Sequence, residues 1–336
     1  MVNYMNQNKE KIDFVMIWVD GNDPKWQKEK VKYNPNKNTD SRNIRYRDWE
    51  NLKYWFRGVE KYAPWVNKIY FVTCGHYPDW LNKENPKLVC VKHEDYIPKE
   101  YLPTFSANPI EINLHRIKNL SEQFVFFNDD IFIIDKINPT YFFKKGKPCG
   151  IAVFQPVSGE DETFVSIKNN VNLIINRHFK KKNIVRNNFF KYFNFKYGKY
   201  SFSTLCCLPY ARILGFYEAH NATSFLKSTY QKIWEKEFDI LDNTSRNKFR
   251  NPRDVNQYLF ENWQFCEGNF YPRKSKSKFL KVFDDVDYAS NIIKKQKYPL
   301  ICLNDTESSD SEFECAKKEI IEAFEQIFPE KSSFER

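Results

Sequence analysis

The sequence lacks any apolar stretch near the ~20 residues that a membrane-spanning helix needs. Its polar N-terminal stretch, MVNYMNQNKEKID, has no apolar core of the kind found in secretory signal peptides. None of the cysteines forms a Cys-x-x-Cys pair, which argues against a zinc site or a disulfide framework. We therefore expect a cytoplasmic protein with reduced thiols, for which a peripheral contact at the inner face of the cell membrane stays open.

Dense basic blocks and nucleic-acid-binding motifs are also missing. Lysine and arginine total 53 against 43 for aspartate and glutamate, yet the longest basic run is only Lys180–Lys182. A positive charge spread in this way suits a phosphate-bearing substrate or an anionic membrane surface. Because no module signature accompanies it, we expect no nucleic-acid partner. At 336 residues the chain can bury one large core or two.

The most informative stretch is Lys118–Ile134, where polar residues interrupt an apolar segment. Two short runs rich in Phe, Val and Ile flank Asn128, Asp129 and Asp130, and runs of this kind predict buried strands. Adjacent carboxylates repel each other when buried, so the pattern predicts a divalent cation with oxygen ligands, Mg²⁺ or Mn²⁺. A solvated turn between two strands is the alternative.

Apolar runs alternate with helical spacing elsewhere, which predicts an α/β protein with a mostly parallel sheet flanked by helices. Further strands are expected at Ile12–Val19, Lys68–Thr73, Lys87–Val91, Gly150–Gln155 and Leu300–Leu303. Helices are expected after the cap Asp23, at Arg45–Tyr62, within Tyr101–Ile117 with Ser106 or Asn108 as the cap, and at Asp161–Asn176, Asn187–Phe195, Ser228–Glu237, Pro252–Cys266 and Ser311–Phe328. Loops are expected at Tyr33–Asn43 and Arg273–Lys281.

Three of the predicted strands end in asparagine and aspartate. These clusters are Asp20–Asp23, Asn128–Asp130 and Asn304–Asp305. In a parallel sheet such ends meet at one edge, where α/β proteins bind ligands. Arginines that could clamp a phosphate there are Arg47, Arg116 and Arg250. Each cluster alone is explained by an ordinary connection, but together they predict a site for a metal-bound diphosphate.

In these same segments the chain resembles the Stealth family of bacterial capsular and cell-wall polysaccharide phosphotransferases. Ile12–Asp23 resembles the first of the family's four conserved regions. The other regions resemble, in order, Arg45–Asn82 with Leu102–Ile133, the segment from His220 to Arg250, and Ile301–Glu307 with Lys331–Glu335. The resemblance covers nearly the whole chain, and its second region is the most specific.

The resemblance implies a GT-A-like α/β domain with a family-specific helical insertion. It also implies an enzyme that transfers a hexose-1-phosphate from a UDP-sugar to a hydroxyl of an oligosaccharide or lipid-linked glycan, releasing UMP. Residues 1–150 would form the nucleotide-sugar-binding core, residues 151–218 an accessory segment for the acceptor, and residues 219–336 the part completing the same active site. The alternatives are an ordinary glycosyltransferase releasing UDP and a non-catalytic binding protein.

The resemblance also implies a role for individual residues. Asp129 and Asp130 would hold the metal. Substrate-binding roles fall to Asp20, Asn22, Arg47, His115 and Asn304. Catalytic roles fall to His220, Arg250, Asp48, Asp305 and Arg116. A neutral imidazole suits a general base near pH 7, so His220 is the first choice for that role.

Several points stay open at this stage. Asp48 and Asp305 are alternative bases, and a structural role for His220 is the competing interpretation. The chain departs from the family pattern at Asn221, where an apolar residue is usual, and at Thr306, where a third acidic residue is usual. The second departure removes one candidate metal ligand.

Overall fold

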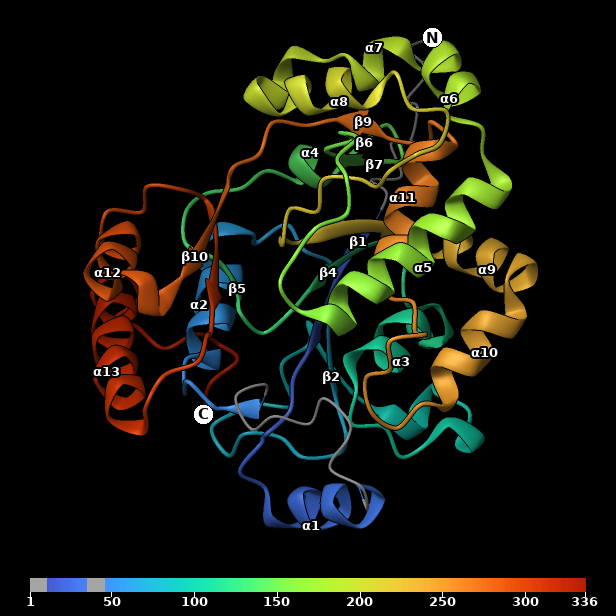
Figure 1. The fold of residues 1–336 in the computed structure, drawn as a ribbon. Coiled ribbons are helices and arrows are strands. Elements are labelled where there is room, and N and C mark those ends of the chain that lie inside the picture. Colours follow the sequence, from blue (N-terminus) through green and yellow to red (C-terminus); the bar gives the residue numbers. More distant parts are fainter. Residues whose placement is uncertain (1–10, 35–45) are drawn as a thin grey trace, which may run out of the picture.

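The computed structural model describes residues 11–34 and 46–336, and its central element is a five-stranded sheet (Figure 1). The strand order is β3 (Leu88–Lys92), β2 (Ile69–Thr73), β1 (Ile12–Ile17), β4 (Gln123–Phe127) and β8 (Thr223–Leu226). The first four strands are parallel, and β8 is antiparallel to β4. The three strands β2, β1 and β4 are nearly continuous buried runs, as a sheet covered on both faces requires.

Two smaller sheets complete the strand inventory of the described residues. One contains β10 (Ser277–Lys281), β11 (Leu300–Asn304) and β5 (Ile131–Ile133), and the other contains β6 (Phe143–Lys144), β7 (Lys147–Gly150) and β9 (Tyr271–Pro272). Since β5 follows β4 after three residues, the chain leaves the central sheet at Asn128–Asp130 and joins the second sheet there. The predicted α/β class with a mostly parallel sheet is confirmed.

The helices cover both faces of the central sheet. They are α1 (Pro24–Tyr33), α2 (Leu52–Tyr62), α3 (Ala107–Ile112), α4 (Pro139–Phe142), α5 (Glu162–His178), α6 (Lys181–Asn187), α7 (Phe189–Tyr192), α8 (Ser201–Cys207), α9 (Lys227–Lys236), α10 (Phe238–Arg246), α11 (Tyr258–Cys266), α12 (Val286–Lys294) and α13 (Asp310–Ile327). Phe14 and Met16 pack with α2, α12 and α13, whereas Val15 packs with α3, α9 and α11. This alternation follows from the two-residue period of a strand.

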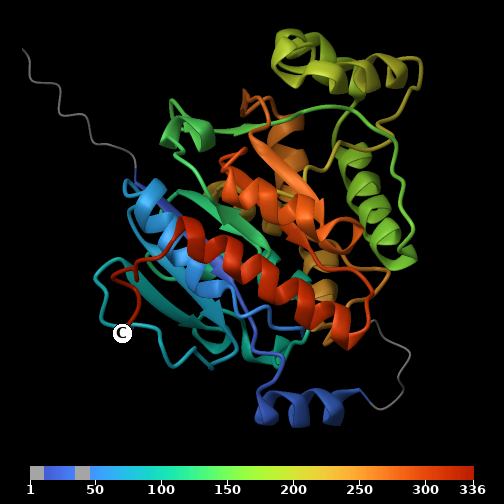
Figure 2. The ribbon, with the colours of Figure 1, turned by 90° about the vertical axis from the view of Figure 1, so that its left-hand side faces the viewer.

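Residues 180–212, which contain helices α6, α7 and α8, form a cap at one end of the molecule, seen at the top of both ribbon views (Figures 1 and 2). The cap is tied to the body by hydrogen bonds from Tyr192 to the Phe265 carbonyl and from the Phe154 amide to Thr204. It corresponds to the helical insertion expected within residues 151–218. The functional division of the chain at residues 150 and 218 stays a prediction. Among the described residues, no helix has the length and apolarity needed to cross a bilayer.

Two local start signals are confirmed in atomic detail. The Asp23 carboxylate accepts a hydrogen bond of 2.7 Å from the Trp26 amide, and Pro24 opens α1. The Ser106 hydroxyl accepts from the Asn108 amide at the start of α3. Both side chains satisfy amides that the first helical turn leaves unpaired.

Two helices begin later than predicted. The helix expected from Arg45, which lies outside the described residues, starts only at Leu52. Asp48 accepts from the Glu50 amide, and Glu50 has a φ of 53°, so this segment forms a turn. The helix expected from Pro252 starts at Tyr258, because the Asp254 carboxylate accepts from the Asn251 amide and holds a turn there.

The remaining errors concern short elements. The loop predicted at Arg273–Lys281 contains β10, an edge strand whose lysines made it resemble a linker. Of the strand predicted at Gly150–Gln155, Gly150 ends β7 and Phe154 forms only an isolated bridge. Of the helix predicted at Asn187–Phe195, Asn187 ends α6 and residues 189–192 form the short helix α7. Strand β8 and helices α10 and α12 were not predicted. Of the loop predicted at Tyr33–Asn43, Tyr33 ends α1, and residues 35–43 lie outside the described residues.

Candidate active site

The ends of β1, β4 and β11 open into one cavity of about 1310 Å³. Its walls come from residues 17–19 after β1, residues 46–49 before α2, Asn128–Asp130, residues 216–220 and residues 303–307. Ligand pockets in proteins usually measure roughly 300–1,000 Å³, so this cavity has room for two substrates together. Two of the three predicted acidic clusters therefore meet in one space.

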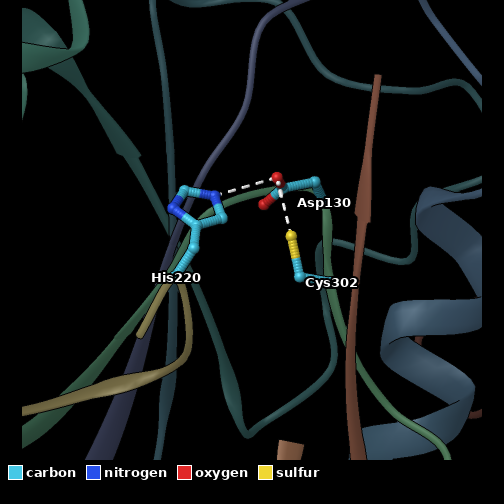
Figure 3. Close-up of side chains that lie close together, drawn as sticks. All are labelled: Asp130, His220 and Cys302. Carbon is cyan, nitrogen blue, oxygen red and sulfur yellow. Dashed lines mark hydrogen bonds and ion pairs between the residues drawn. The ribbon is translucent and has the colours of Figure 1, made fainter. Parts of the chain in front are cut away.

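Asp130 is the centre of a three-residue contact (Figure 3). Its Oδ2 lies 3.0 Å from His220 Nε2 and 3.2 Å from the Cys302 Sγ, which donates to it. These side chains come from the loop after β4, the loop before β8 and strand β11. The Asp130 carbonyl also accepts from the Leu303 amide at 2.8 Å, which fixes this loop against β11.

The two charged groups of this contact shift each other's titration. Burial of the imidazole opposes its protonation, but the charge and hydrogen bond of Asp130 outweigh burial, so the pKa of His220 lies above its ordinary value. Burial likewise favours the neutral carboxyl of Asp130, yet His220 and Cys302 together hold the pKa of Asp130 below its ordinary value. Each group of the pair therefore favours the charged form of the other.

Asp129 is exposed to the cavity next to this pair. Desolvation of the carboxyl group by the protein around it, and then the negative charge of Asp130, raise the pKa of Asp129 to about 7. The charge of Asp48 adds to the repulsion. A carboxyl group with this pKa is half protonated near neutral pH unless a cation holds it ionised. Asp48 also lines the cavity, and burial raises its pKa as well.

The residues present fit a divalent cation. Among the described residues, the Asp130 Oδ1 is buried without a hydrogen-bond partner, although its other oxygen has two. An unsatisfied carboxylate oxygen beside the repelled carboxyl of Asp129 is the oxygen donor set that Mg²⁺ and Mn²⁺ prefer. Ligand atoms of Asp130, His220 and Cys302 also lie within 4.8 Å of one another, and their nitrogen and sulfur would suit a softer ion.

Arg47 and Asp305 form a bidentate ion pair with distances of 3.1 and 2.7 Å, although 258 positions separate them in the chain. Trp49 Nε1 donates to Asp305 as well. Arg47 and Asp305 both line the cavity, as predicted. Both carboxylate oxygens of Asp305, however, already accept hydrogen bonds from Arg47. The structure therefore disfavours Asp305 as the alternative general base. Its neighbour Asn304 lines the cavity and donates to the Asp305 carbonyl.

Arg250 lies in the same cavity, which is also lined by two glutamates that sequence reasoning missed. The Glu111 carboxylate accepts from the Gln257 amide, and burial raises its pKa to about 7, although the charge of Arg250 opposes that shift. Burial also raises the pKa of Glu218 to about 7, despite its ion pair with Lys168. Neither glutamate follows a strand or an acidic neighbour, so the sequence carried no signal for them.

Four predicted site residues are not among the described residues that line the cavity. Asp20 accepts from the Asn22 amide within the turn after β1, and Asn22 is exposed. This turn packs beside the cavity wall, since a Cβ on Gly21 would lie 1.9 Å from the Tyr46 carbonyl oxygen. The direct substrate contact predicted for Asp20 and Asn22 is therefore not supported by their placement.

His115 and Arg116 lie against α9 instead of the cavity. The His115 ring is buried beside Trp234, and burial followed by the charge of Arg116 lowers its pKa to about 3. The Arg116 guanidinium stacks over Trp234 and donates to Asn113. These contacts place His115 and Arg116 outside the cavity lining, which does not support the roles predicted for His115 in substrate binding and for Arg116 in catalysis.

A mostly parallel α/β sheet, whose strand ends gather carboxylates, a His–Asp pair and two arginines, defines an α/β enzyme suited to charged substrates. Comparisons with known proteins give the family. A model of Stealth protein conserved region 2 matches residues 45–149, and a model of conserved region 1 matches residues 10–38. Regions three and four of the resemblance stay predictions.

Full-length relatives agree with these models. The chain is 48% identical to the capsular polysaccharide phosphotransferase WcwK of Streptococcus pneumoniae, over 98% of this chain and 99% of the relative. It is 42% identical to the receptor polysaccharide phosphotransferase WefC of Streptococcus gordonii, over 97% and 99%. It is 36% identical to the exopolysaccharide phosphotransferase cps2G of Lactiplantibacillus plantarum, over 97% and 96%. The chain belongs to the Stealth family of polysaccharide phosphotransferases.

Solved structures are more distant. The galactosyltransferase LgtC, in complex with donor and acceptor sugar analogues, matches 93% of this chain and 95% of its own. The sequence identity is 10% and the TM-score is 0.40.

Proposed function

We propose that the enzyme transfers a hexose-1-phosphate from a UDP-sugar to a hydroxyl of a capsular or cell-surface glycan. The acceptor oxygen bonds to the phosphorus that carries the hexose, the bond from this phosphorus to the bridging oxygen breaks, and UMP leaves with that oxygen. The proposal rests on one observation above all. The His220–Asp130 pair, the repelled carboxyl of Asp129 and Arg250 share a single cavity with room for donor and acceptor.

His220 is the general base in this proposal. Asp130 occupies Nε2, so the hydrogen on that nitrogen points to the carboxylate and Nδ1 is the atom that takes the acceptor proton. The carboxylate fixes the ring and stabilises the imidazolium that forms, as an aspartate does for histidine in hydrolase triads. Asp48, whose pKa is raised by burial, is the alternative base.

Charge neutralisation is the other task of a phosphoryl-transfer site. Arg250 supplies a guanidinium inside the cavity, and Arg47 is held rigidly by Asp305 on the opposite segment. Asp129 and the unpaired oxygen of Asp130 would hold Mg²⁺ or Mn²⁺. When bound, such an ion would neutralise the diphosphate of the donor. Arg116 has no part in this scheme, because it lies against α9.

Product analysis tests the proposal. The protein is incubated with a panel of UDP-sugars and oligosaccharide acceptors, with and without Mg²⁺ or Mn²⁺, and phosphorus NMR follows the products. UMP together with a phosphodiester in the glycan is the expected result, and a chelator should abolish both. UDP release with no phosphorus in the glycan would instead establish an ordinary glycosyltransferase. Binding of UDP-sugars without any turnover would establish a binding protein.

A further inference from the structure

The cap formed by residues 180–212 exposes an unusual number of large apolar side chains. Phe195 is 90% exposed, Phe190 is 81% exposed and Phe202 is 69% exposed. The other exposed apolar side chains of the cap are Phe189, Leu205, Leu208 and Tyr210. Together these are seven of the thirteen large apolar side chains that are exposed in the described residues. Large apolar side chains exposed together on one segment mark an interaction surface more often than a plain solvated surface.

The charge of the same segment has only one sign. Residues 180–212 contain no aspartate or glutamate. Their cations are Lys180, Lys181, Lys182, Arg186, Lys191, Lys196, Lys199 and Arg212. All of these except Lys181 and Lys191 are exposed. Exposed phenylalanines interspersed with lysines, and no acids, match the requirements of an anionic lipid surface, which attracts the cations and takes up the rings.

The cap presents these side chains from a fixed framework. The Lys181 ammonium is buried and donates to the carbonyls that end α8, at 2.7 Å for Cys207. Ser203 and Thr204 both bond to the backbone of Phe154 in the body of the molecule. The apolar residues that hold the cap together, Ile184, Tyr192, Tyr197 and Cys207, are already buried. The exposed rings are therefore additional to the cap's own core.

The cap also reaches the active site. The 3₁₀ helix Phe195–Tyr200 begins with the most exposed of the rings and ends with Tyr200, which lines the cavity. Tyr200 packs on Tyr217, another cavity residue, with 4.4 Å between ring centroids. A surface bound at Phe195 would thus lie only a few residues of chain away from the cavity wall.

We propose that the cap of residues 180–212 docks on an anionic lipid bilayer and holds the active-site cavity beside it. In this position the cavity meets glycan acceptors anchored in that bilayer, a consequence that rests on the proposed function. The docking itself does not, because the exposed phenylalanines and cations that it concerns do not line the catalytic cavity. The cations provide attraction from a distance, and the phenylalanines provide apolar contact once the surface is reached.

Flotation with lipid vesicles tests the docking. The full chain is mixed with vesicles of phosphatidylcholine alone or with about one third phosphatidylglycerol, and the bound fraction is measured at low and high salt. We expect strong binding to the anionic vesicles only, falling as salt rises because exposed charges are screened. Equal binding to both compositions, or to neither, would overturn the proposal. The mass of the lipid-free protein in solution is measured at several protein concentrations. If this mass rises with concentration and vesicle binding falls in parallel, the cap binds a second copy of the chain, which would also overturn the proposal.

Two sets of variants separate the apolar and electrostatic contributions. The triple variant Phe190→Ser, Phe195→Ser and Phe202→Ser should weaken binding to anionic vesicles roughly tenfold or more. The variant Lys180→Gln, Lys182→Gln and Arg186→Gln should weaken it about fivefold per charge and reduce the salt dependence. The matched control is Phe238→Ser on α10, which removes a ring that is 54% exposed outside the cap and should change nothing.

An activity assay with a soluble acceptor separates failure of the docking proposal from failure of the proposed function. The phenylalanine variant should retain its release of UMP with a water-soluble oligosaccharide, which also shows that it folds. Unchanged vesicle binding in both cap variants would overturn the docking while leaving the phosphotransferase proposal intact. Vesicle binding without any UMP release would leave the docking intact and refute the phosphotransferase proposal.

Discussion

At the scale of single residues, the contact between His220 and Asp130 determines how activity should depend on pH. The base must be neutral to accept a proton, and Asp130 holds the pKa of His220 above the ordinary value of 6.5. The neutral fraction therefore grows as pH rises through that higher pKa. We expect kcat/KM to increase with pH, with a midpoint above 6.5, in a profile measured between pH 5 and 9.

Substitution of the base should remove this profile. His220→Ala should lower kcat by roughly 10²- to 10⁴-fold, the usual contribution of general base catalysis. Asp48→Asn is the companion variant, because Asp48 is the alternative base in the same cavity. If His220→Ala kept turnover within a few-fold of the wild type, and only Asp48→Asn lost the fall in activity at low pH, Asp48 would be the general base instead.

Cys302 offers a second prediction at this scale. Its thiol donates to the Asp130 Oδ2 from β11, so it orients the carboxylate that orients His220. Cys302→Ala removes a hydrogen bond from a weak thiol donor to a charged acceptor, so it should lower kcat by up to about tenfold. Cys302→Ser keeps a donor and should recover most of the activity. Equal kcat in the two variants, with unchanged melting temperatures, would contradict this positioning role.

At the scale of elements, α2 is clamped to the C-terminal segment by a buried ion pair. Arg57 donates to both Glu335 oxygens, at 2.7 and 2.6 Å, and to the Phe328 carbonyl. Removing one partner of such a pair leaves an uncompensated buried charge, so Arg57→Ala should lower the free energy of unfolding by about 3–5 kcal/mol. Urea denaturation measures it. Lys53→Ala on the same helix, which breaks an exposed pair with Glu325, should cost less than about 1 kcal/mol.

The pH dependence of that clamp follows from Glu335. Burial favours its neutral form, but hydrogen bonds from Arg57 and Ser332 outweigh burial and hold the pKa of Glu335 below its ordinary value of 4.5. A lowered carboxyl pKa stabilises the fold above the ordinary value, and the stabilisation is lost as pH falls through the folded value. The difference between wild type and Arg57→Ala should therefore be full at pH 7 and shrink as the pH falls below 4.5. A difference that stays constant between pH 7 and pH 3 would contradict this assignment.

The elements that sequence reasoning predicted are those with a strong local signal. Apolar runs predicted β1, β2 and β4, and side-chain caps predicted the starts of α1 and α3. Strand β10 was missed because its exposed lysines obscure the apolar pattern, and it becomes a strand only by pairing with β11. The late start of α2 follows the turn at Asp48 and Glu50, and the contact of Arg47 with Asp305 beside that turn is one that no local pattern encodes.

The same distinction applies to the site. Asn128–Asp130 and Asn304–Asp305 were predicted to converge because each follows a strand, and both line the cavity. His115 was misplaced because nearness in sequence to the acidic pair does not give nearness in space. The buried acid Glu111 and the thiol of Cys302 gain their positions only from packing between distant segments.

At the scale of the whole molecule, the site is assembled from segments far apart in the chain. The bidentate pair between Arg47 and Asp305 joins the loop before α2 to the end of β11 in the lining of the cavity. Arg47→Lys keeps the charge but loses the planar fork that fits both carboxylate oxygens. We therefore expect kcat/KM to fall by about 10- to 100-fold, corresponding to the loss of ~1.4–2.7 kcal/mol of transition-state stabilisation.

A matched variant shows whether this loss belongs to the cavity. Arg246 forms the same bidentate contact with Asp242, at 2.8 and 2.9 Å, on the exposed surface of α10. Arg246→Lys should leave kcat/KM unchanged, because neither partner lines the active-site cavity. If Arg47→Lys kept the wild-type kcat/KM, the joining of these two segments would be a matter of stability alone. If catalysis depends on the spacing of the cavity walls, kcat/KM should instead fall while the melting temperature stays unchanged.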